Sequence, residues 1–311
     1  MRALRIGSRG SLLAQWQANS IRNLLARTPG VKAEIILIKT SGDRFQQANV
    51  SQIGLKGVFI KELEDALFEG RVDLAVHSMK DVPTETPAGL AFPAICQRED
   101  VRDCLVAHKP GAKLSDLPPG ARVGTSSLRR QSQLRHHRPD LDMHELRGNV
   151  DTRLRKAEQG EYDAVVLAKA GLDRLGWSDR ISEVISTDIS LPAVGQGALG
   201  IEARADDQEV LDLLAQLDHA ETRAAVTAER ALLAKLEGGC QVPLGAWARI
   251  ERQELVLDAC VLSIDGADYI RLRAAGFPQH AEDLGRELAE TLLAAGADRI
   301  LRLVGRNIDR H

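Results

Sequence analysis

The amino-acid sequence predicts an α/β fold built in more than one part. Short apolar segments alternate with amphipathic helical segments from residue 3 onward, and this pattern restarts near Asp100. Closely spaced strands then begin near residue 244. The alternation favours βαβ units with a largely parallel sheet, and the C-terminal third is typical of a small α+β domain. At 311 residues the chain is long enough for two or three domains.

Composition excludes several classes of protein. Hydrophobic residues make up 44% and charged residues 27%, as in soluble globular proteins. Only 3% of the residues are aromatic and the net charge is −3, so nucleic acid is not an expected partner. We find neither an apolar signal segment nor a run of about 18 apolar residues, so we expect no membrane partner and a cytoplasmic location. The four cysteines lack metal-ligand spacing, so neither a metal site nor a disulfide framework is expected.

The first segments predict a strand followed by a capped helix. Residues 3–9 fit a short strand, and Ser11 fits the N-cap of an amphipathic helix. Arg9 and Ser11 therefore lie at a strand-to-helix turn, where free helix N–H groups and a guanidinium can bind an anion. A solvated arginine beside an ordinary cap is the alternative.

A glycine-punctuated loop separates the next two elements. Residues 33–40 fit a buried strand and 58–69 a helix with one apolar face. A loop as long as 41–57 is either a lid or disordered. Lys56, at its glycine-flanked end, could reach a bound anion, although a solvated lysine is the common outcome.

The following strand ends in a charged turn. Residues 72–77 fit a buried strand, and Lys80 and Asp81 follow it directly. In α/β sheets, ligands bind outside the carboxyl ends of the strands, so chemistry is expected at this turn. A surface ion pair between the two side chains is the alternative.

The second part carries the densest basic cluster of the chain. Strands are expected at 104–107, 121–124, 141–146 and 163–168, with helices from Ser126 and at 149–159. The arginines of the cluster are Arg122, Arg129, Arg130, Arg135, Arg138, Arg147, Arg153 and Arg155. Several basic strand-to-helix turns in one small domain suggest a pocket for a ligand with several carboxylates or phosphates. A solvated basic face is the alternative.

Residues 195–200 form a literal G-x-G-x-x-G motif. A dinucleotide site would need a helix directly after it, whereas Ile201 begins a strand-like segment. We therefore interpret these glycines as a hinge where the chain crosses between domains.

A single cysteine follows the next helix. The helical pattern of 219–236 stops at two glycines, and Cys240 comes directly after them. The dipole at a helix C-terminus disfavours a thiolate, so the position gives no reason for an acidic thiol. Cys240 is either a small buried hydrophobe or the attachment point of a covalent cofactor. Strands near 244–250, 254–263 and 268–275, a helix at 281–295 and a last strand near 298–304 are expected beyond it.

Six segments, in order, resemble the porphobilinogen deaminase (hydroxymethylbilane synthase) family. They are 5–9 (RIGSR), 76–83 (VHSMKDVP), 123–130 (VGTSSLRR), 146–149 (LRGN), 189–197 (ISLPAVGQG) and 236–243 (LEGGCQVP). The resemblance covers essentially the whole chain. It implies two periplasmic-binding-protein-like (type II) α/β domains, 1–97 with 196–217 and 98–195, plus a small C-terminal α+β domain, 218–311.

The resemblance also implies the activity. Members of this family are transferases of haem biosynthesis that condense four porphobilinogens head to tail, releasing ammonia, onto a dipyrromethane primer. Hydrolysis then releases hydroxymethylbilane. The primer is bound by a thioether to the cysteine that matches Cys240, and Asp81 matches the catalytic aspartate, which would stabilise the cationic azafulvene left when ammonia departs. A monomer is expected.

Further residues acquire expected roles in the same way. The residues expected to bind the cofactor are Lys80, Asp81, Thr125, Ser126, Ser127, Arg129, Arg130, Arg147, Arg153, Leu167, Ala168 and Arg174. Those expected to bind the substrate are Arg9, Ser11, Arg147, Arg153 and Gln196. Lys56 is placed on a mobile loop. The chain departs from the commoner family pattern at Leu12, where proline is frequent, and at Leu55, where glycine is frequent.

A second hypothesis is a cytoplasmic two-domain anion-binding protein without catalysis, in which Cys240 is incidental. It accounts for the arginines and the α/β repeats. It does not account for the predicted third domain.

Overall fold

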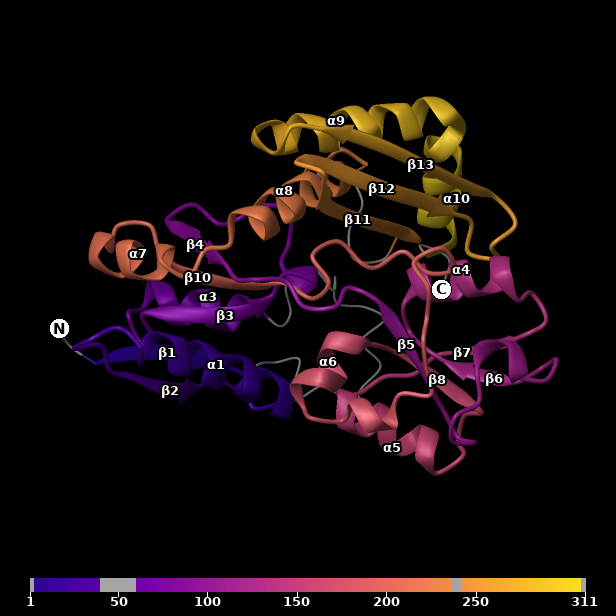
Figure 1. The fold of residues 1–311 in the computed structure, drawn as a ribbon, viewed down its shortest axis with the longest axis horizontal. Coiled ribbons are helices and arrows are strands. Elements are labelled where there is room, and N and C mark those ends of the chain that lie inside the picture. Colours follow the sequence, from indigo (N-terminus) through magenta and orange to yellow (C-terminus); the bar gives the residue numbers. More distant parts are fainter. Residues whose placement is uncertain (1–2, 40–59, 237–241, 309–311) are drawn as a thin grey trace. The chain divides into compact units, whose positions relative to one another are not determined.

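A computed structural model describes residues 3–39, 60–236 and 242–308, with side chains described up to residue 304. Lys56, Leu55 and Cys240 lie outside these ranges. The chain divides into two compact units, Met1–Arg98 with Ala198–Arg223 and Glu99–Gly197 with Ala224–His311. Each unit is described by itself below, with the element labels of Figure 1.

The first unit contains a five-stranded sheet in the order β2-β1-β3-β10-β4. Its strands are β1 (Leu4–Ser8), β2 (Ala33–Leu37), β3 (Leu74–Ser78), β4 (Leu90–Ile95) and β10 (Leu199–Arg204). β1 runs parallel to β2 and β3, but β10 runs antiparallel to β3 and β4. Four strands thus run in one direction, as a largely parallel sheet predicts, and β10 is the antiparallel exception. This strand enters from the second unit, so no βαβ crossover fixes its direction.

Helices cover both faces of this sheet. They are α1 (Leu12–Leu25), α3 (Lys61–Phe68) and α7 (Gln208–Ala215). α1 and α7 pack on one face through apolar side chains that include Ile21 and Leu213, while α3 packs on the other through Leu63 and Leu67. Ser11 caps α1 as predicted, since its hydroxyl accepts a hydrogen bond from the N–H of Ala14 at 3.3 Å.

The second unit begins with another mixed sheet, in the order β7-β6-β8-β5-β9. Its strands are β5 (Asp103–Ala107), β6 (Arg122–Gly124), β7 (Asp142–His144), β8 (Ala164–Ala168) and β9 (Glu183–Val184). β6 is parallel to β7 and β8, whereas β5 is antiparallel to β8 and β9. The helices of this part are α4 (Leu128–His137), α5 (Val150–Glu158) and α6 (Lys169–Arg174).

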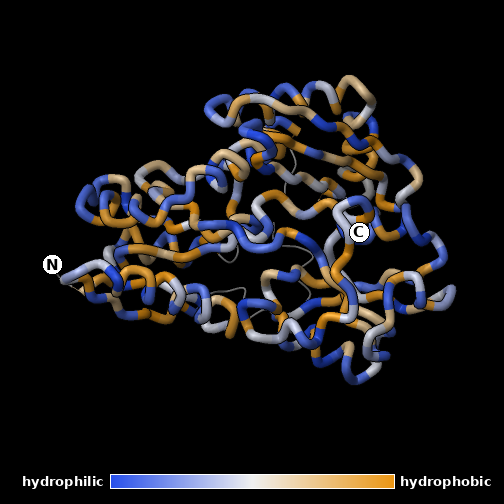
Figure 2. The backbone as a smooth tube through the Cα atoms, viewed as in Figure 1, coloured by the Kyte–Doolittle hydropathy of each residue, from blue (hydrophilic) through white to orange (hydrophobic). Residues whose placement is uncertain are grey.

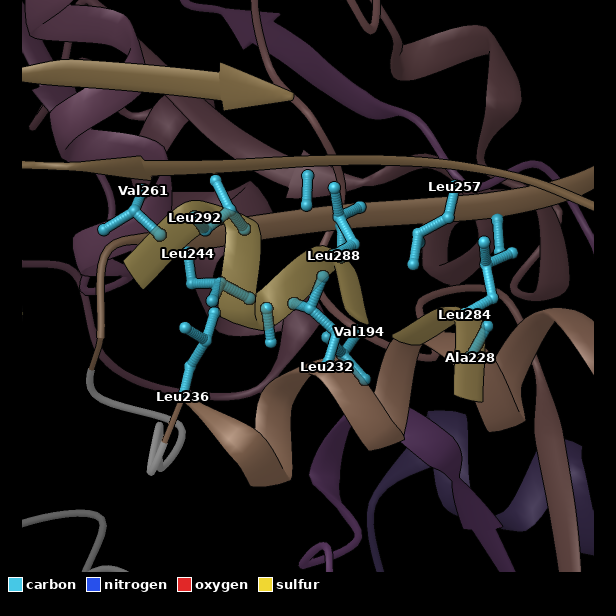
Figure 3. Close-up of a cluster of buried hydrophobic side chains, with 14 of the residues drawn as sticks. Val194, Ala228, Leu232, Leu236, Leu244, Leu257, Val261, Leu284, Leu288 and Leu292 are labelled. Carbon is cyan, nitrogen blue, oxygen red and sulfur yellow. The ribbon is translucent and has the colours of Figure 1, made fainter. Parts of the chain in front are cut away.

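The C-terminal part of the second unit is the expected small α+β arrangement. Strands β11 (Leu244–Glu251), β12 (Glu254–Leu262) and β13 (Tyr269–Gly276) form an antiparallel sheet, with helices α8 (Ala220–Lys235) and α9 (Ala281–Leu292). Figure 3 shows the core of this part, a buried cluster that includes Leu232 of α8, Leu288 of α9 and the strand residue Leu257. Figure 2 shows how hydrophobic and hydrophilic positions alternate along the helices.

The last predicted element is wrong. Residues 298–304, expected as a strand, belong to helix α10 (Asp298–Ile308). Ile300 and Val304, four residues apart, are buried, whereas Arg302 between them is exposed. That is the spacing of a helix face, which a short apolar segment does not distinguish from a strand. The mixed α/β fold class itself is confirmed.

We expect Gly285→Ala to destabilise the C-terminal part. A Cβ at Gly285 would lie 2.2 Å from the carbonyl oxygen of Ala228 in α8 and 2.9 Å from the Ala231 Cβ, so α9 would have to move off α8. Overpacking of this kind lowers the free energy of unfolding by about 1–3 kcal/mol, more than the helix propensity of alanine restores.

Denaturant unfolding monitored by circular dichroism measures the change. Gly276→Ala is the matched control, because its Cβ would lie 3.4 Å from Leu284, an ordinary contact. Equal stability of the two variants would contradict the expected close packing of α8 on α9.

Candidate active site

The candidate residues of the first unit gather at one edge of its sheet. Arg9 and Ser11 follow β1, and Lys80 and Asp81 follow β3. Since β1 and β3 are adjacent and parallel, both turns lie at the carboxyl ends of these strands. The Asp81 side chain is exposed, whereas Arg9 and Lys80 are half-buried. This edge therefore presents a carboxylate to solvent with two basic residues on the same turns.

The turn that carries Asp81 is fixed by Met79. Met79–Asp81 form a single 3₁₀ turn, and the N–H of Met79 donates to the carbonyl oxygen of Ala198 at 3.0 Å. The Met79 side chain lies over Gly200, where an added Cβ would come within 2.2 Å of the Met79 sulfur. Gly200 thus leaves room for the buried side chain that precedes Lys80 and Asp81.

A buried acid–base pair lies on the strands beneath this turn. His77 of β3 and Glu202 of β10 are at most 5% exposed, and His77 Nε2 lies 3.0 Å from Glu202 Oε2. The two atoms are within ion-pair distance, although their angles fall outside those of a regular hydrogen bond. Burial raises the pKa of the nearby Glu64 carboxyl, and the charge of Glu202 raises it further. Glu202 and His77 are thus buried polar groups placed against each other, an arrangement that is costly to break.

In the second unit, candidate residues again follow adjacent parallel strands. Thr125 follows β6, Arg147 lies after β7, and Leu167 and Ala168 end β8. Because β7, β6 and β8 are neighbours in this order, these residues come from one edge of the sheet. The structure therefore brings the predicted strand-to-helix turns of this part together.

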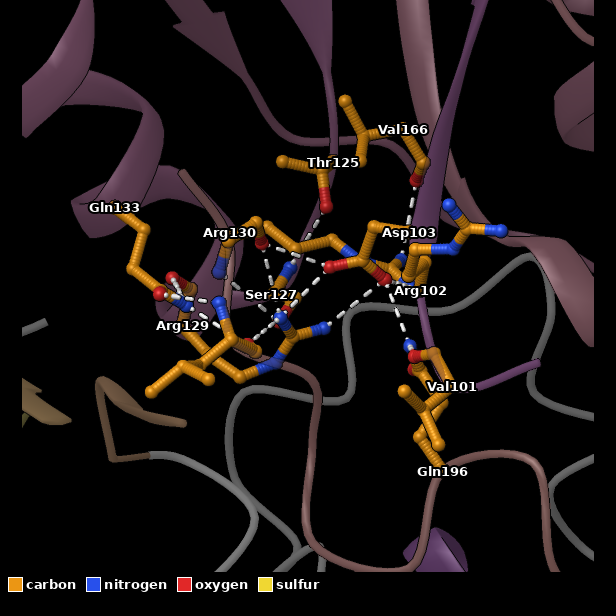
Figure 4. A network of polar contacts seen from close by, with 12 residues as sticks. Val101, Arg102, Asp103, Thr125, Ser127, Arg129, Arg130, Gln133, Val166 and Gln196 are labelled. Atoms are coloured by element: carbon orange, nitrogen blue, oxygen red, sulfur yellow. Dashed lines mark hydrogen bonds and ion pairs between the residues drawn. The ribbon is translucent and has the colours of Figure 1, made fainter. Parts of the chain in front are cut away.

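Arg129 and Arg130 are buried and bind one carboxylate. Figure 4 shows that both guanidinium groups meet Asp103, the first residue of β5. Arg129 Nη1 lies 2.7 Å from Asp103 Oδ2, and Arg130 Nη2 lies 2.8 Å from Asp103 Oδ1. The hydroxyl of Ser190 and the side-chain amide of Gln196 also donate to Asp103, at 2.9 Å each. The sequence interpretation missed Asp103, although a charged residue at the start of a buried strand was a usable signal.

This group of side chains carries a net positive charge. Burial by itself would raise the pKa of Asp103, but the charges and hydrogen bonds of Arg129 and Arg130 hold it well below its usual value. Burial lowers the pKa of Arg129, against the attraction of Asp103. Two guanidinium groups and one carboxylate sum to +1 in a place where each residue is at most 5% exposed. An additional carboxylate would neutralise the group, so the donor set fits a ligand with acidic side chains.

Several other predicted residues have partners within the protein. Ser127 caps α4 by accepting from the N–H of Arg130, and the Thr125 hydroxyl accepts from the N–H of Ser127. Ser126 Oγ bonds to the main chain of Leu146. Leu167 is 2% exposed and belongs to the core. These contacts shape the strand-to-helix turn.

The remaining arginines differ in exposure. Arg147 is exposed and pairs with Glu145 at 2.6 Å, and Arg153 Nε donates to the carbonyl oxygen of Gly148 at 2.8 Å. Arg174 is 7% exposed, and its guanidinium binds Glu99 at 3.0 Å. Arg174 Nη2 also donates to the carbonyl oxygen of Gly197 at 2.9 Å.

The described cysteines are buried thiols. Burial raises the pKa of Cys104 to about 12 and that of Cys260 to about 11, and Cys96 is 8% exposed. At neutral pH Cys104 and Cys260 are protonated and inaccessible, so neither is suited to form a thioether. Cys240 lies outside the described residues.

Comparison with known proteins assigns the family. Residues 4–212 match the family model "Porphobilinogen deaminase, dipyromethane cofactor binding domain", and residues 223–294 match "Porphobilinogen deaminase, C-terminal domain". The chain belongs to the porphobilinogen deaminase family. Membership makes it a transferase of tetrapyrrole biosynthesis with a dipyrromethane cofactor, as the resemblance implied.

Curated relatives match over nearly their whole length. The porphobilinogen deaminase of Trichlorobacter lovleyi is 52% identical over 96% of this chain and 95% of its own. The porphobilinogen deaminase of Geobacter metallireducens is 50% identical over 96% of this chain and 93% of its own.

Similar solved structures include the probable extracellular-binding protein of an amino-acid ABC transporter from Bacillus subtilis. It is 12% identical at a TM-score of 0.41, over 70% of this chain and 90% of that chain. The periplasmic VFT2 domain of BvgS from Bordetella pertussis is 15% identical at a TM-score of 0.42, over 69% and 86% of the two chains.

The described residues contain neither a metal-ligand cluster nor a membrane-spanning helix. No cluster of three or more histidine, cysteine or acidic side chains in this part of the chain is arranged to hold a metal ion. No described helix has the length and apolar character needed to cross a membrane.

We expect His77→Phe to destabilise the first unit. The substitution keeps an aromatic ring beside Phe92, whose ring centroid lies 6.0 Å from that of His77, but leaves the carboxyl group of Glu202 buried without its polar partner. Leaving a buried polar group without its partner lowers the free energy of unfolding by about 1–3 kcal/mol.

Urea unfolding at neutral pH measures the loss. The double variant H77F, E202L removes both polar groups and should recover most of the lost stability. A single variant as stable as the parent would show that the contact between His77 and Glu202 does not contribute to stability.

Proposed function

We propose that this chain condenses four porphobilinogens head to tail on a dipyrromethane bound to Cys240, and that hydrolysis releases hydroxymethylbilane. The observation that carries the assignment of residues is the buried group of Arg129, Arg130 and Asp103, whose net charge of +1 calls for a ligand carboxylate. Each pyrrole of the substrate bears an acetate and a propionate, so carboxylates accumulate as the product lengthens. Arginine is the residue suited to bind them.

Asp81 is the proposed catalytic residue. Its carboxylate is exposed at the carboxyl end of β3, on the turn that Met79 fixes. An ionised carboxylate in this position stabilises the positive charge that develops on the substrate as ammonia leaves. It can also accept a proton when the new carbon–carbon bond forms. Lys80, on the same turn, is proposed to bind an acidic side chain of the cofactor.

Arg9 and Ser11 are proposed to receive the incoming porphobilinogen. They lie at the turn beside that of Asp81, where α1 begins. A carboxylate bound there would meet the guanidinium of Arg9 and the positive end of the helix dipole. Leu12, at the position where proline is frequent, is the first residue of α1 and continues the helix.

The other residues of the second unit share the binding of carboxylates in this proposal. Arg147, after β7, and Arg153, in α5, are proposed to bind both cofactor and substrate. The side chain of Arg147 is exposed and can do so directly. The remaining proposed cofactor contacts are Thr125, Ser126, Ser127, Leu167, Ala168 and Arg174. Gln196 is buried and donates a hydrogen bond to Asp103. We therefore propose that Gln196 affects substrate binding indirectly, by holding Asp103 in place.

Cys240 is the proposed attachment point. When bound, dipyrromethane supplies the pyrrole carbon onto which the first substrate is added. A stable thioether needs a correctly placed sulfur and no repeated turnover as a thiolate, so the unfavourable position after a helix is no obstacle. Burial of Cys96, Cys104 and Cys260 supports this choice. We further propose that the chain is a cytoplasmic monomer. Its proposed domains are 1–97 with 196–217, 98–195 and 218–311.

Intact mass spectrometry tests the attachment. The purified protein should exceed its sequence mass by one dipyrromethane, and Cys240→Ala should have the unmodified mass and no activity. Cys96→Ala is the control, because it also removes one cysteine sulfur and should keep the adduct. An active protein of unmodified mass would disprove a covalent primer.

Asp81→Asn should separate catalysis from cofactor binding. We expect kcat to fall by about 10²–10⁴-fold, because the carboxylate that supports proton transfer and charge is lost, while the adduct mass remains. Ammonia release from porphobilinogen measures turnover. Asp212→Asn, at an exposed position in α7, is the control and should be fully active. Rapid ammonia release by the Asp81 variant would refute the assigned role.

A further inference from the structure

The carboxylate of Asp103 accepts hydrogen bonds from four different residues. Oδ1 accepts from Arg129, Arg130 and Gln196, and Oδ2 accepts from Arg129 and Ser190. Asp103 itself is 0% exposed. A carboxylate offers about four lone-pair positions, so its capacity is filled entirely from within the protein. Asp103 therefore fixes the planes of both guanidinium groups before any ligand arrives.

The arginines keep donors that Asp103 does not use. Arg129 Nη1 also donates to the carbonyl oxygen of Leu191 at 2.6 Å, and Arg130 Nη1 donates to that of Val166 at 3.1 Å. Arg129 Nε is buried and has no hydrogen-bond acceptor among the described residues. A buried N–H without an acceptor is costly, and on a positively charged group it is suited to an anion.

We propose that Asp103 is a positioning residue for ligand binding, an internal carboxylate that one carboxylate of the dipyrromethane joins and does not displace. This rests on the proposed function. The internal carboxylate reduces the charge of the arginine pair from +2 to +1, so a single ligand carboxylate makes the group neutral. The pair thus accepts one acidic side chain of the pyrrole, and Arg147, which is exposed at the same edge, is left for another.

Joining is favoured over displacement because Asp103 does not depend on the arginines alone. Ser190 and Gln196 donate to it from a different segment of the chain, each at 2.9 Å. If a ligand displaced Asp103 from the arginines, the Asp103 carboxylate would stay buried with only these two neutral donors. The free-energy cost of that burial exceeds any gain, because the displacement only exchanges one ion pair for another. Asp103 and the ligand carboxylate therefore bind the two guanidinium groups together.

Asp103→Asn tests this role in the full-length protein. The amide of asparagine has the size of the carboxylate but carries no charge. Its NH₂ group also presents donors to the guanidinium donors, so the orientation of the two guanidinium groups is lost. We expect the fraction of protein carrying dipyrromethane, measured by intact mass, to fall by about tenfold or more, the effect of one lost charge-assisted hydrogen bond. KM for porphobilinogen should rise in the fraction that retains the cofactor. Asp100→Asn is the matched control and should load fully, because Asp100 pairs with Arg102 near the surface at 2.6 Å.

Chemical rescue distinguishes positioning from a general structural role. Asp103→Gly opens space for a small carboxylate, so sodium formate should restore cofactor loading, whereas sodium chloride at the same ionic strength should not. Circular dichroism identifies an Asp103→Gly variant that does not fold, and in that case the loading of Asp103→Asn decides. Full loading and a parental KM in Asp103→Asn would overturn the inference. A parent protein of unmodified mass would instead overturn the proposed function on which the inference rests.

Discussion

The buried ion pairs around Asp103 constrain the whole second unit. Two consecutive arginines on α4 are at most 5% exposed, which is possible only because a carboxylate from 26 residues earlier in the chain neutralises part of their charge. Removing either side of such a pair leaves a charge in a medium that solvates it poorly. The ion pairs form only when three segments are correctly placed relative to one another. These are β5, the start of α4 and the segment near Ser190.

The same constraint reaches the C-terminal part of the unit. Gln133, one turn after Arg129 on α4, exchanges hydrogen bonds with the main chain of Leu191, and the Cys260 thiol donates to its side-chain oxygen. Leu191 in turn packs against Gly245, where an added Cβ would lie 2.7 Å from the Leu191 Cβ. Helix α4 is thus held to β5 through Arg129 and Arg130, and to the sheet of β11 and β12 through Gln133. Its arginines keep their geometry through packing that needs no ligand.

Much of the fold could be predicted from local pattern. The three strands after residue 244 and the helices with one apolar face lie where periodicity places them, because burial of that face is a local property of the sequence. The antiparallel entry of β10 and β5 could not be predicted, since strand direction depends on which distant segments pair. Residues 298–304 were predicted wrongly because a short apolar segment fits both a strand and a helix until its neighbours are known.

For the candidate site, the chemical groups could be read from the sequence alone: a carboxylate after β3, hydroxyls and arginines at strand-to-helix turns, and motifs sufficient to name the family. It could not distinguish arginines that are exposed, such as Arg147, from those that are buried, such as Arg129 and Arg130. That distinction depends on folding, which places Asp103 against α4. The free energy of a buried charge depends on its partners, and these lie far apart in the chain until folding brings them together.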